Sequence, residues 1–227
     1  LNSCLNPARA SVMRQRIAED SVRGPSRPRP RWIEAASPLP AAPASVDEQW
    51  AGRRSHRSFS PEPVTEMELS QLLWPLSERP DGSRRLPSGG GKYPLLVYAL
   101  LLSVDGRSPM AGWYDPVNHG LTTVGEVPSW PALAPILGVD WEHPPAIVFV
   151  ITARPQAMLS KYGERGGRFA LIEAGMYLGA LQTETTRLGL GGVAIGAFDD
   201  RRVLQLLNAD PKGELAVIAY AAGRPCS

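Results

Sequence analysis

Residues 84–103, RRLPSGGGKYPLLVYALLLS, join a basic loop with three consecutive glycines to a long apolar run. The run from Leu95 to Ser103 has the length of one buried strand, and proline and glycine lie on its flanks. The glycine loop precedes this strand, whereas the phosphate loop of a dinucleotide-binding fold follows its strand. The loop also lacks the glycine spacing and the Lys-Ser/Thr pair of a P-loop. The stretch therefore argues against both nucleotide-binding folds.

The elements on either side of this stretch follow no regular strand–helix–strand period. Thr65, with Glu68 three residues on, forms a capping box and predicts the start of a helix. Residues 168–188 predict the longest helix, and Gly175 and Gly179 on one of its faces permit close approach of another backbone. Further helices are expected over 11–20, 47–53, 130–137 and 199–207, and further strands over 112–115, 120–124, 146–152, 193–195 and 215–222. This mixture predicts an α+β fold.

The N-terminal part of the chain differs in composition from the rest. Residues 23–31, RGPSRPRPR, are rich in arginine and proline, and a Pro/Ala stretch follows them. Proline fixes φ and lacks an amide donor, so an extended segment is expected here. We predict an arm or linker over residues 1–45 and a folded domain over 46–227. Disorder and an arm that wraps a partner subunit are the alternatives, and the initial leucine is compatible with excision from a longer polypeptide.

Composition and charge argue against several classes of partner, namely nucleic acid, membranes and metal ions. The chain has 227 residues, 43% hydrophobic and 20% charged, and a net charge of +2, which favours neither nucleic acid nor an anionic membrane as a partner. No apolar run approaches the ~20 residues of a membrane span, and no signal peptide is visible, so a cytoplasmic protein is expected. The two cysteines, Cys4 and Cys226, form no zinc-ligand pattern, so no metal site is predicted. Free thiols and a disulfide between the termini are both compatible with this pair.

Three segments have residues suited to chemistry. Residues 53–59, RRSHRSF, offer guanidinium and hydroxyl donors for a phosphate. The glycines of the 84–94 loop can form an anion-binding concavity from backbone amides. Residues 160–169, SKYGERGGRF, place a lysine beside a tyrosine in a glycine-rich turn, a pair that can exchange protons with a substrate. Each segment alone is also compatible with an ordinary solvated surface turn.

The motifs in combination are more specific than any one of them. They run in order as RRSxRxF, RxxPSGGxxYP, GWYxPxxHxL, KYGxRGxR, EAG, LGLG, IGAF and GRP, from Arg53 to Pro225. This series resembles the nitroreductase superfamily, and more narrowly its azoline oxidase branch, the thiazoline and oxazoline dehydrogenases. The resemblance implies an α+β fold with a mixed central sheet flanked by helices, and a homodimer that binds FMN at its interface.

The resemblance also assigns roles to individual residues. Lys161 and Tyr162 match the pair that handles protons in azoline oxidation. The segment that holds the flavin and its phosphate matches Arg53, Arg54, Ser55 and Arg57. A loop that lies on the flavin from the partner subunit matches Pro87, Ser88, Gly89 and Gly90. Further matches are Ile195 and Gly196 near the flavin ring, and Arg224 toward the phosphate. Departures from the pattern are Lys92, Met176, Gly179 and Ala180.

The sequence therefore predicts an FMN-dependent enzyme that dehydrogenates thiazoline or oxazoline rings in peptide natural-product biosynthesis. Its substrate is expected to be a peptide or a carrier-bound intermediate, and its partners a second copy of the chain and a biosynthetic complex or synthetase modules. One alternative is an NAD(P)H-dependent reductase of nitroaromatics, quinones or enones. Another is a dehydrogenase or reductase of a peptidyl substrate on a carrier domain. A third is a non-catalytic scaffold subunit with the same fold.

Overall fold

The computed structural model describes residues 39–41, 43–45 and 51–226. The chain divides into two units, Leu1–Asp47 and Glu48–Ser227. In the first unit the described residues are exposed, and 44–45 are helical. The predicted helix over 11–20, the Arg/Pro segment 23–31 and Cys4 lie outside the described residues, as does most of the helix predicted over 47–53. The domain boundary predicted after residue 45 lies close to the division between the units.

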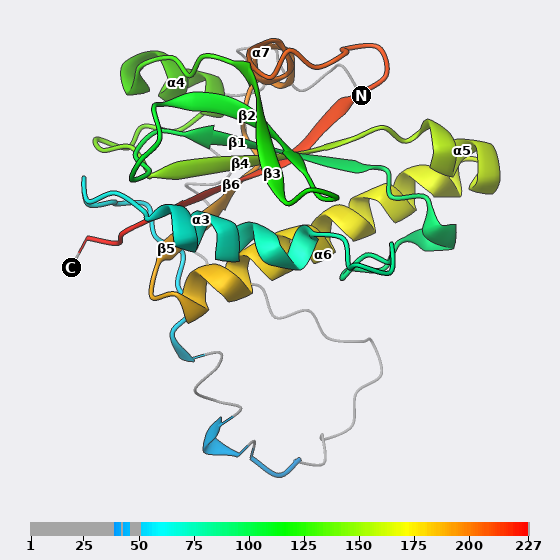
Figure 1. The fold of residues 1–227 in the computed structure, drawn as a ribbon, viewed down its shortest axis with the longest axis horizontal. Helices are drawn as coiled ribbons and strands as arrows, with labels where there is room; N and C mark the ends of the chain where they lie inside the picture. Colours follow the sequence, from blue (N-terminus) through cyan, green and yellow to red (C-terminus); the bar gives the residue numbers. More distant parts are fainter. Residues whose placement is uncertain (1–38, 42, 46–50, 227) are drawn as a thin grey trace, which may run out of the picture. The chain divides into compact units, whose positions relative to one another are not determined.

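A six-stranded sheet forms the centre of the second unit (Figure 1). Its order is β3-β2-β1-β4-β6-β5, and every neighbouring pair is antiparallel. Parallel pairing, which the expected mixed sheet requires, is confined among the described residues to isolated bridges such as Ser55–Gly192. The strands are β1 (Leu95–Leu101), β2 (Met110–Asp115), β3 (Gly120–Gly125), β4 (Ile147–Ala153), β5 (Gly191–Ile195) and β6 (Leu215–Gly223). The predicted α+β class is confirmed, with strand directions that alternate across the sheet.

Helices cover both faces of this sheet (Figure 1). Residues of α3 (Glu66–Leu73) and α6 (Arg165–Arg187) pack on one face, against Val97 and Phe149 among others. Residues of α4 (Trp130–Leu137) and α7 (Asp200–Leu206) pack on the other face, against Leu100 and Val148. Alternate residues of β1 and β4 thus enter opposite cores, which explains why both strands are apolar throughout. No helix in the described part of the chain has the length and apolarity of a membrane span.

The local signals in the sequence specify most of these elements. The capping box is present: the Thr65 amide donates to Glu68 (2.8 Å), and the Glu68 amide donates to the Thr65 hydroxyl (3.2 Å). The helix predicted over 168–188 is α6, which begins three residues earlier. The segment around Lys161 was expected to be a turn, but it is the end of a short helix, α5 (Gln156–Tyr162). The turn is confined to the residues between α5 and α6, where Gly163 has a φ of 58°.

Candidate functional site

Lys161 and Tyr162 lie against the glycine loop of their own chain. A side chain at Gly90 would collide with the Lys161 ammonium and the Tyr162 hydroxyl. Gly90 also has a φ of 61°, a conformation that residues other than glycine rarely adopt. The structure therefore brings together two segments that are far apart in the sequence, and it gives a physical reason for glycine at this position.

Helix α5 presents this pair at its last turn. The Tyr162 ring meets the Phe169 ring edge-on, with centroids 5.0 Å apart, and Lys161 Nζ lies 5.3 Å from the centroid of the tyrosine ring. Lys161 is exposed and Tyr162 is half-buried. Gly166 lets α6 pack directly behind α5, because a side chain there would collide with the Met158 backbone. A phenol packed against an aromatic ring and an exposed amine thus lie side by side.

The glycine loop is anchored by a carboxylate to which the sequence reading gave no role. Glu173 on α6 is 4% exposed. Its Oε1 accepts hydrogen bonds from the Ser88 hydroxyl (3.0 Å) and from the Gly89 amide (2.8 Å). The Tyr93 amide in turn donates to the Ser88 hydroxyl oxygen (2.8 Å). The loop was expected to form a concavity for an anion, and here the Gly89 amide binds a carboxylate of the same chain.

The arginine-rich segment lies beside β5. A bridge joins Ser55 to Gly192, and the His56 amide donates to the Gly192 carbonyl at 3.1 Å. Arg53, Arg54 and Arg57 are exposed, and none of them pairs with a carboxylate within residues 51–226. The guanidinium of Arg54 donates to the carbonyls of Ala51 (2.8 Å) and Arg53 (3.0 Å), whereas that of Arg53 lies 3.5 Å from the Ser55 hydroxyl. Arg53 and Arg57 are therefore better placed than Arg54 to bind an anion.

The other predicted flavin contacts divide between two environments. Ile195 ends β5, the strand that the arginine segment joins, and is buried, whereas Gly196 directly follows the strand and is exposed. Arg224 lies just past β6, and its carbonyl accepts the Ser60 amide (2.9 Å). Its guanidinium, however, is directed at Glu68, with Nη1–Oε1 and Nη2–Oε2 both 2.8 Å. In this structure the Arg224 guanidinium therefore forms an ion pair within the chain.

The two groups of predicted site residues lie at well-separated points along α6 in one chain. A Cβ at Gly52, next to the arginine segment, would be 3.5 Å from the Thr186 side chain, near the end of α6. The glycine loop contacts Glu173, thirteen residues earlier on the same helix. At 1.5 Å per residue this separation is about 20 Å along the helix axis. One chain therefore brings each group together but does not join the two.

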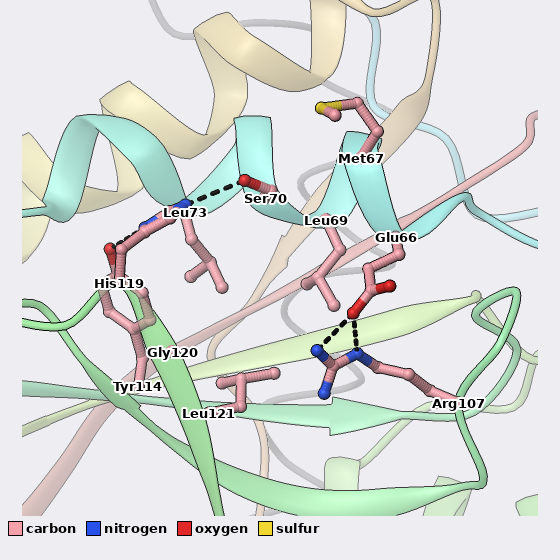
Figure 2. A pocket seen from close by; sticks show the side chains of 10 residues that line it. All are labelled: Glu66, Met67, Leu69, Ser70, Leu73, Arg107, Tyr114, His119, Gly120 and Leu121. Atoms are coloured by element: carbon pink, nitrogen blue, oxygen red, sulfur yellow. Dashed lines mark hydrogen bonds and ion pairs between the residues drawn. The ribbon is translucent and has the colours of Figure 1, made fainter.

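A separate open pocket of about 520 Å³ lies between α3 and the β2–β3 hairpin (Figure 2). His119 lines it and is fixed by the Ser70 hydroxyl at Nε2 (2.9 Å) and the Tyr114 hydroxyl at Nδ1 (2.7 Å). Burial, with the nearby Arg85 guanidinium, lowers the pKa of His119 below its ordinary value. Glu66 and Arg107 form an ion pair at the other side of the pocket. None of the residues predicted for catalysis or flavin binding lines this pocket.

A family model described as the nitroreductase family matches residues 50–224. The chain belongs to the nitroreductase family. This membership confirms the family resemblance of the motifs and indicates an oxidoreductase. Members of the nitroreductase family typically bind flavin. The match begins three residues before Arg53 and ends at Arg224, so all the predicted site residues lie within it.

The chain is similar to two proteins of known sequence and to one solved structure. It is 33% identical over 159 residues to "Putative nitroreductase MJ1384" of Methanocaldococcus jannaschii, covering 68% of this chain and 80% of that protein. It is 29% identical over 165 residues to the microcin B17-processing protein McbC of Escherichia coli, covering 68% of this chain and 60% of McbC. The E. coli microcin synthetase McbBCD complex with truncated pro-MccB17 matches with a TM-score of 0.73 at 20% identity, over 99% of this chain and 96% of the matched chain.

Three buried or half-buried carboxylates were not predicted as site residues. Glu173 lies in the EAG motif and Glu68 in the capping box, so for these two a signal was present in the sequence. Glu214 is fully buried and accepts from the hydroxyls of Tyr98 (2.9 Å) and Thr152 (2.5 Å) and from the Arg154 guanidinium (3.0 Å). No local pattern predicts such a network, because its members are distant in the sequence.

Proposed function

We propose that this nitroreductase-family chain is an FMN-dependent dehydrogenase that converts thiazoline or oxazoline rings to thiazoles or oxazoles in peptide natural-product biosynthesis. The observation that carries the proposal is the convergence of Lys161 and Tyr162 on Gly90. A reduction by NAD(P)H needs the flavin segment but has no requirement for this pair. The similarity to a protein that processes microcin B17 supports the same substrate class.

The exposed arginine segment fits FMN. Arg53 and Arg57 would hold the cofactor through charge-assisted hydrogen bonds to its phosphate and polar edge, and the Ser55 hydroxyl adds a donor between them. The bridge from Ser55 to β5 gives these side chains a rigid backbone. When bound, FMN supplies the acceptor for the hydride that leaves the azoline ring.

The residues of this chain handle the proton. Aromatisation removes one proton and one hydride from adjacent ring carbons, and the proton leaves the carbon that was the Cα of the cyclised residue. We assign its acceptance to Lys161 Nζ as the free amine or to Tyr162 Oη as the phenolate, because both groups lie against the glycine loop at Gly90. The second group of the pair then donates a hydrogen bond that orients the substrate. Phe169 restricts the tyrosine ring on its other side.

A homodimer would complete this site. The separation of about 20 Å along α6 keeps the arginine segment of one chain from its own glycine loop. Helix α6 also exposes Leu171 (62%) and Ile172 (55%), and the Cβ positions of Gly175 and Gly179 have no atom within 4 Å. Such an open face of small and apolar residues suits close packing against a second α6. Two antiparallel copies would bring the arginine segment of one to the glycine loop of the other.

The similarity to one chain of the McbBCD complex supports action within a larger assembly. That complex was solved with a truncated peptide precursor bound. We therefore infer that this chain acts on a peptide-borne azoline alongside partner proteins. A carrier-bound azoline is the second form that the same ring chemistry allows.

The test is a visible spectrum of the purified protein, followed by anaerobic mixing with a thiazoline-containing peptide. We expect a flavin band near ~450 nm that bleaches on mixing, and a product two mass units lighter. Lys161→Ala and Tyr162→Phe should each slow bleaching by about tenfold or more while FMN stays bound. Lys212→Ala, at an exposed lysine in the α7–β6 connection, is the matched control. Bleaching at the wild-type rate in both site variants would reject the assigned roles.

The principal alternative is an NAD(P)H-dependent reductase, which the 33% identity to MJ1384 favours. A flavin that ignores azolines but bleaches with NAD(P)H and turns over a quinone would establish that function. Its rate should be insensitive to Lys161→Ala, because the pair takes no part in it. A protein that binds no flavin, even after FMN is added, would reject both enzymes and leave the scaffold role.

A further inference from the structure

Glu173 is a buried carboxylate that the proposed chemistry does not use. Burial of a carboxylate is costly unless hydrogen bonds or a cation compensate it. In the described part of the chain Glu173 forms no ion pair, and its partners are the Ser88 hydroxyl and the Gly89 amide. The compensation for its charge therefore comes from the glycine loop itself.

These contacts fix the loop at several points. Ser88 donates to Glu173 and accepts from the Tyr93 amide, so one hydroxyl links both ends of residues 88–93 to α6. The Gly91 amide donates to the Ser88 carbonyl at 3.1 Å and closes the turn between them. Three consecutive glycines would otherwise have wide backbone freedom. Removal of the carboxylate thus releases the part of the loop that faces Lys161 and Tyr162.

We propose that Glu173 is a positioning residue whose carboxylate holds residues 88–93 so that Gly90 stays against Lys161 and Tyr162. Within residues 51–226 it forms no hydrogen bond or ion pair with either member of the pair, and it acts through the loop. The inference rests on the proposed function for the consequence in catalysis. Its structural claim, that a carboxylate on α6 sets the shape of the loop, is independent of any substrate.

Hydrogen–deuterium exchange of fragments that span residues 86–94 tests this claim in the purified full chain. Glu173→Ala should speed exchange there by about tenfold or more, since the lost bonds have a charged acceptor. Glu173→Gln keeps an acceptor oxygen in place and should restore most of the protection. Ser88→Ala removes one bond and the acceptor for the Tyr93 amide, so it tests the claim even if Glu173→Ala fails to fold. Glu184→Ala is the matched control, because Glu184 lies on α6 and pairs with Arg187 (2.8 Å).

Three results would overturn the proposal. One is wild-type exchange of residues 86–94 in both Glu173→Ala and Ser88→Ala. Another is a uniform rise in the exchange rate across α6 and the sheet, which would indicate a general loss of packing. The third is an equal loss of protection from exchange in Glu173→Gln and Glu173→Ala, because the glutamine retains the acceptor oxygen.

The same variants separate this inference from the proposed function. In an active wild type, Glu173→Ala should slow azoline oxidation about as much as Lys161→Ala, with FMN content unchanged. Wild-type turnover combined with a released loop would reject the positioning role. A wild type that does not oxidise azolines would reject the proposed function, and the exchange result would still decide whether Glu173 holds the loop.

Discussion

Arg224 and Glu68 form a two-pronged ion pair across 156 residues of sequence, with both nitrogen–oxygen distances at 2.8 Å. Glu68 simultaneously closes the capping box of α3 through the Thr65 amide. The pair therefore joins the start of α3 to the segment that follows β6. That segment also pairs with residues 58–60, at the end of the arginine-rich segment, so the ion pair lies close to the proposed flavin site.

Loss of charge at Glu68 should destabilise the fold. Glu68→Gln leaves an oxygen for the Thr65 amide, as a capping box allows, but it removes the charged acceptor for Arg224. We expect the free energy of unfolding to fall by about 1–3 kcal/mol. Glu62→Gln is the control, because Glu62 is 67% exposed and lies 3.5 Å from Arg224 Nε. Equal urea midpoints for the two variants would show that the two-pronged pair adds nothing to stability.

The same carboxylate should contribute to acid unfolding. Burial alone would raise the pKa of Glu68, but hydrogen bonds from Thr65 and the Arg224 guanidinium outweigh it and hold the pKa below its ordinary 4.5. The unfolded chain then takes up this proton at a higher pH than the folded chain. The stabilisation is complete above about pH 4.5 and is lost as pH falls through the folded value. Urea titrations should show the gap between wild type and Glu68→Gln closing below that pH, and a constant gap would contradict this origin.

Flavin affinity should depend on the arginines unequally. Arg53→Ala and Arg57→Ala should each weaken FMN binding by about tenfold or more, as expected for lost charge-assisted hydrogen bonds. Arg54→Ala should have a smaller effect, because its guanidinium already binds two backbone carbonyls. Fluorescence titration with FMN measures the three affinities, and Arg201→Ala on α7 is the control for loss of one exposed charge. An Arg54 effect larger than that of Arg53 and Arg57 would contradict the assignment.

Local sequence signals predicted most of the fold and only part of the site. The capping box at Thr65 and the apolar strands predicted from Leu95 and from Ala146 are specified by near neighbours, and the structure has them within one residue of those positions. The meeting of Gly90 with Lys161 and the pairing of Glu68 with Arg224 depend on the three-dimensional packing of α3, α5 and α6. No residue pattern along the chain specifies these contacts, because the partners are far apart in the sequence.

Helix α5 is a second feature that the sequence did not predict. Its seven residues are too few for a clear helical period, and the glycines that follow it favour a turn. Gly166 lets the start of α6 pack against the Met158 backbone, and this tertiary contact favours the helix. Tertiary contact therefore overrides the local preference at the place where Lys161 and Tyr162 are presented.

Gly90 and its neighbour Gly91 allow the contact of Gly90 with Lys161 and Tyr162 to be distinguished from the effect of backbone strain. Gly90 and Gly91 have φ values of 61° and 65°, so alanine at either position costs a similar ~1–2 kcal/mol. A Cβ at Gly90 would strike Lys161 Nζ and Tyr162 Oη, whereas a Cβ at Gly91 has no atom within 4 Å. Gly90→Ala should therefore slow azoline oxidation by about tenfold or more beyond Gly91→Ala. We expect the two variants to have similar melting temperatures, because the backbone strain is alike. Equal turnover in the two variants, measured with FMN bound, would show that the contact of Gly90 with the pair does not matter for the reaction.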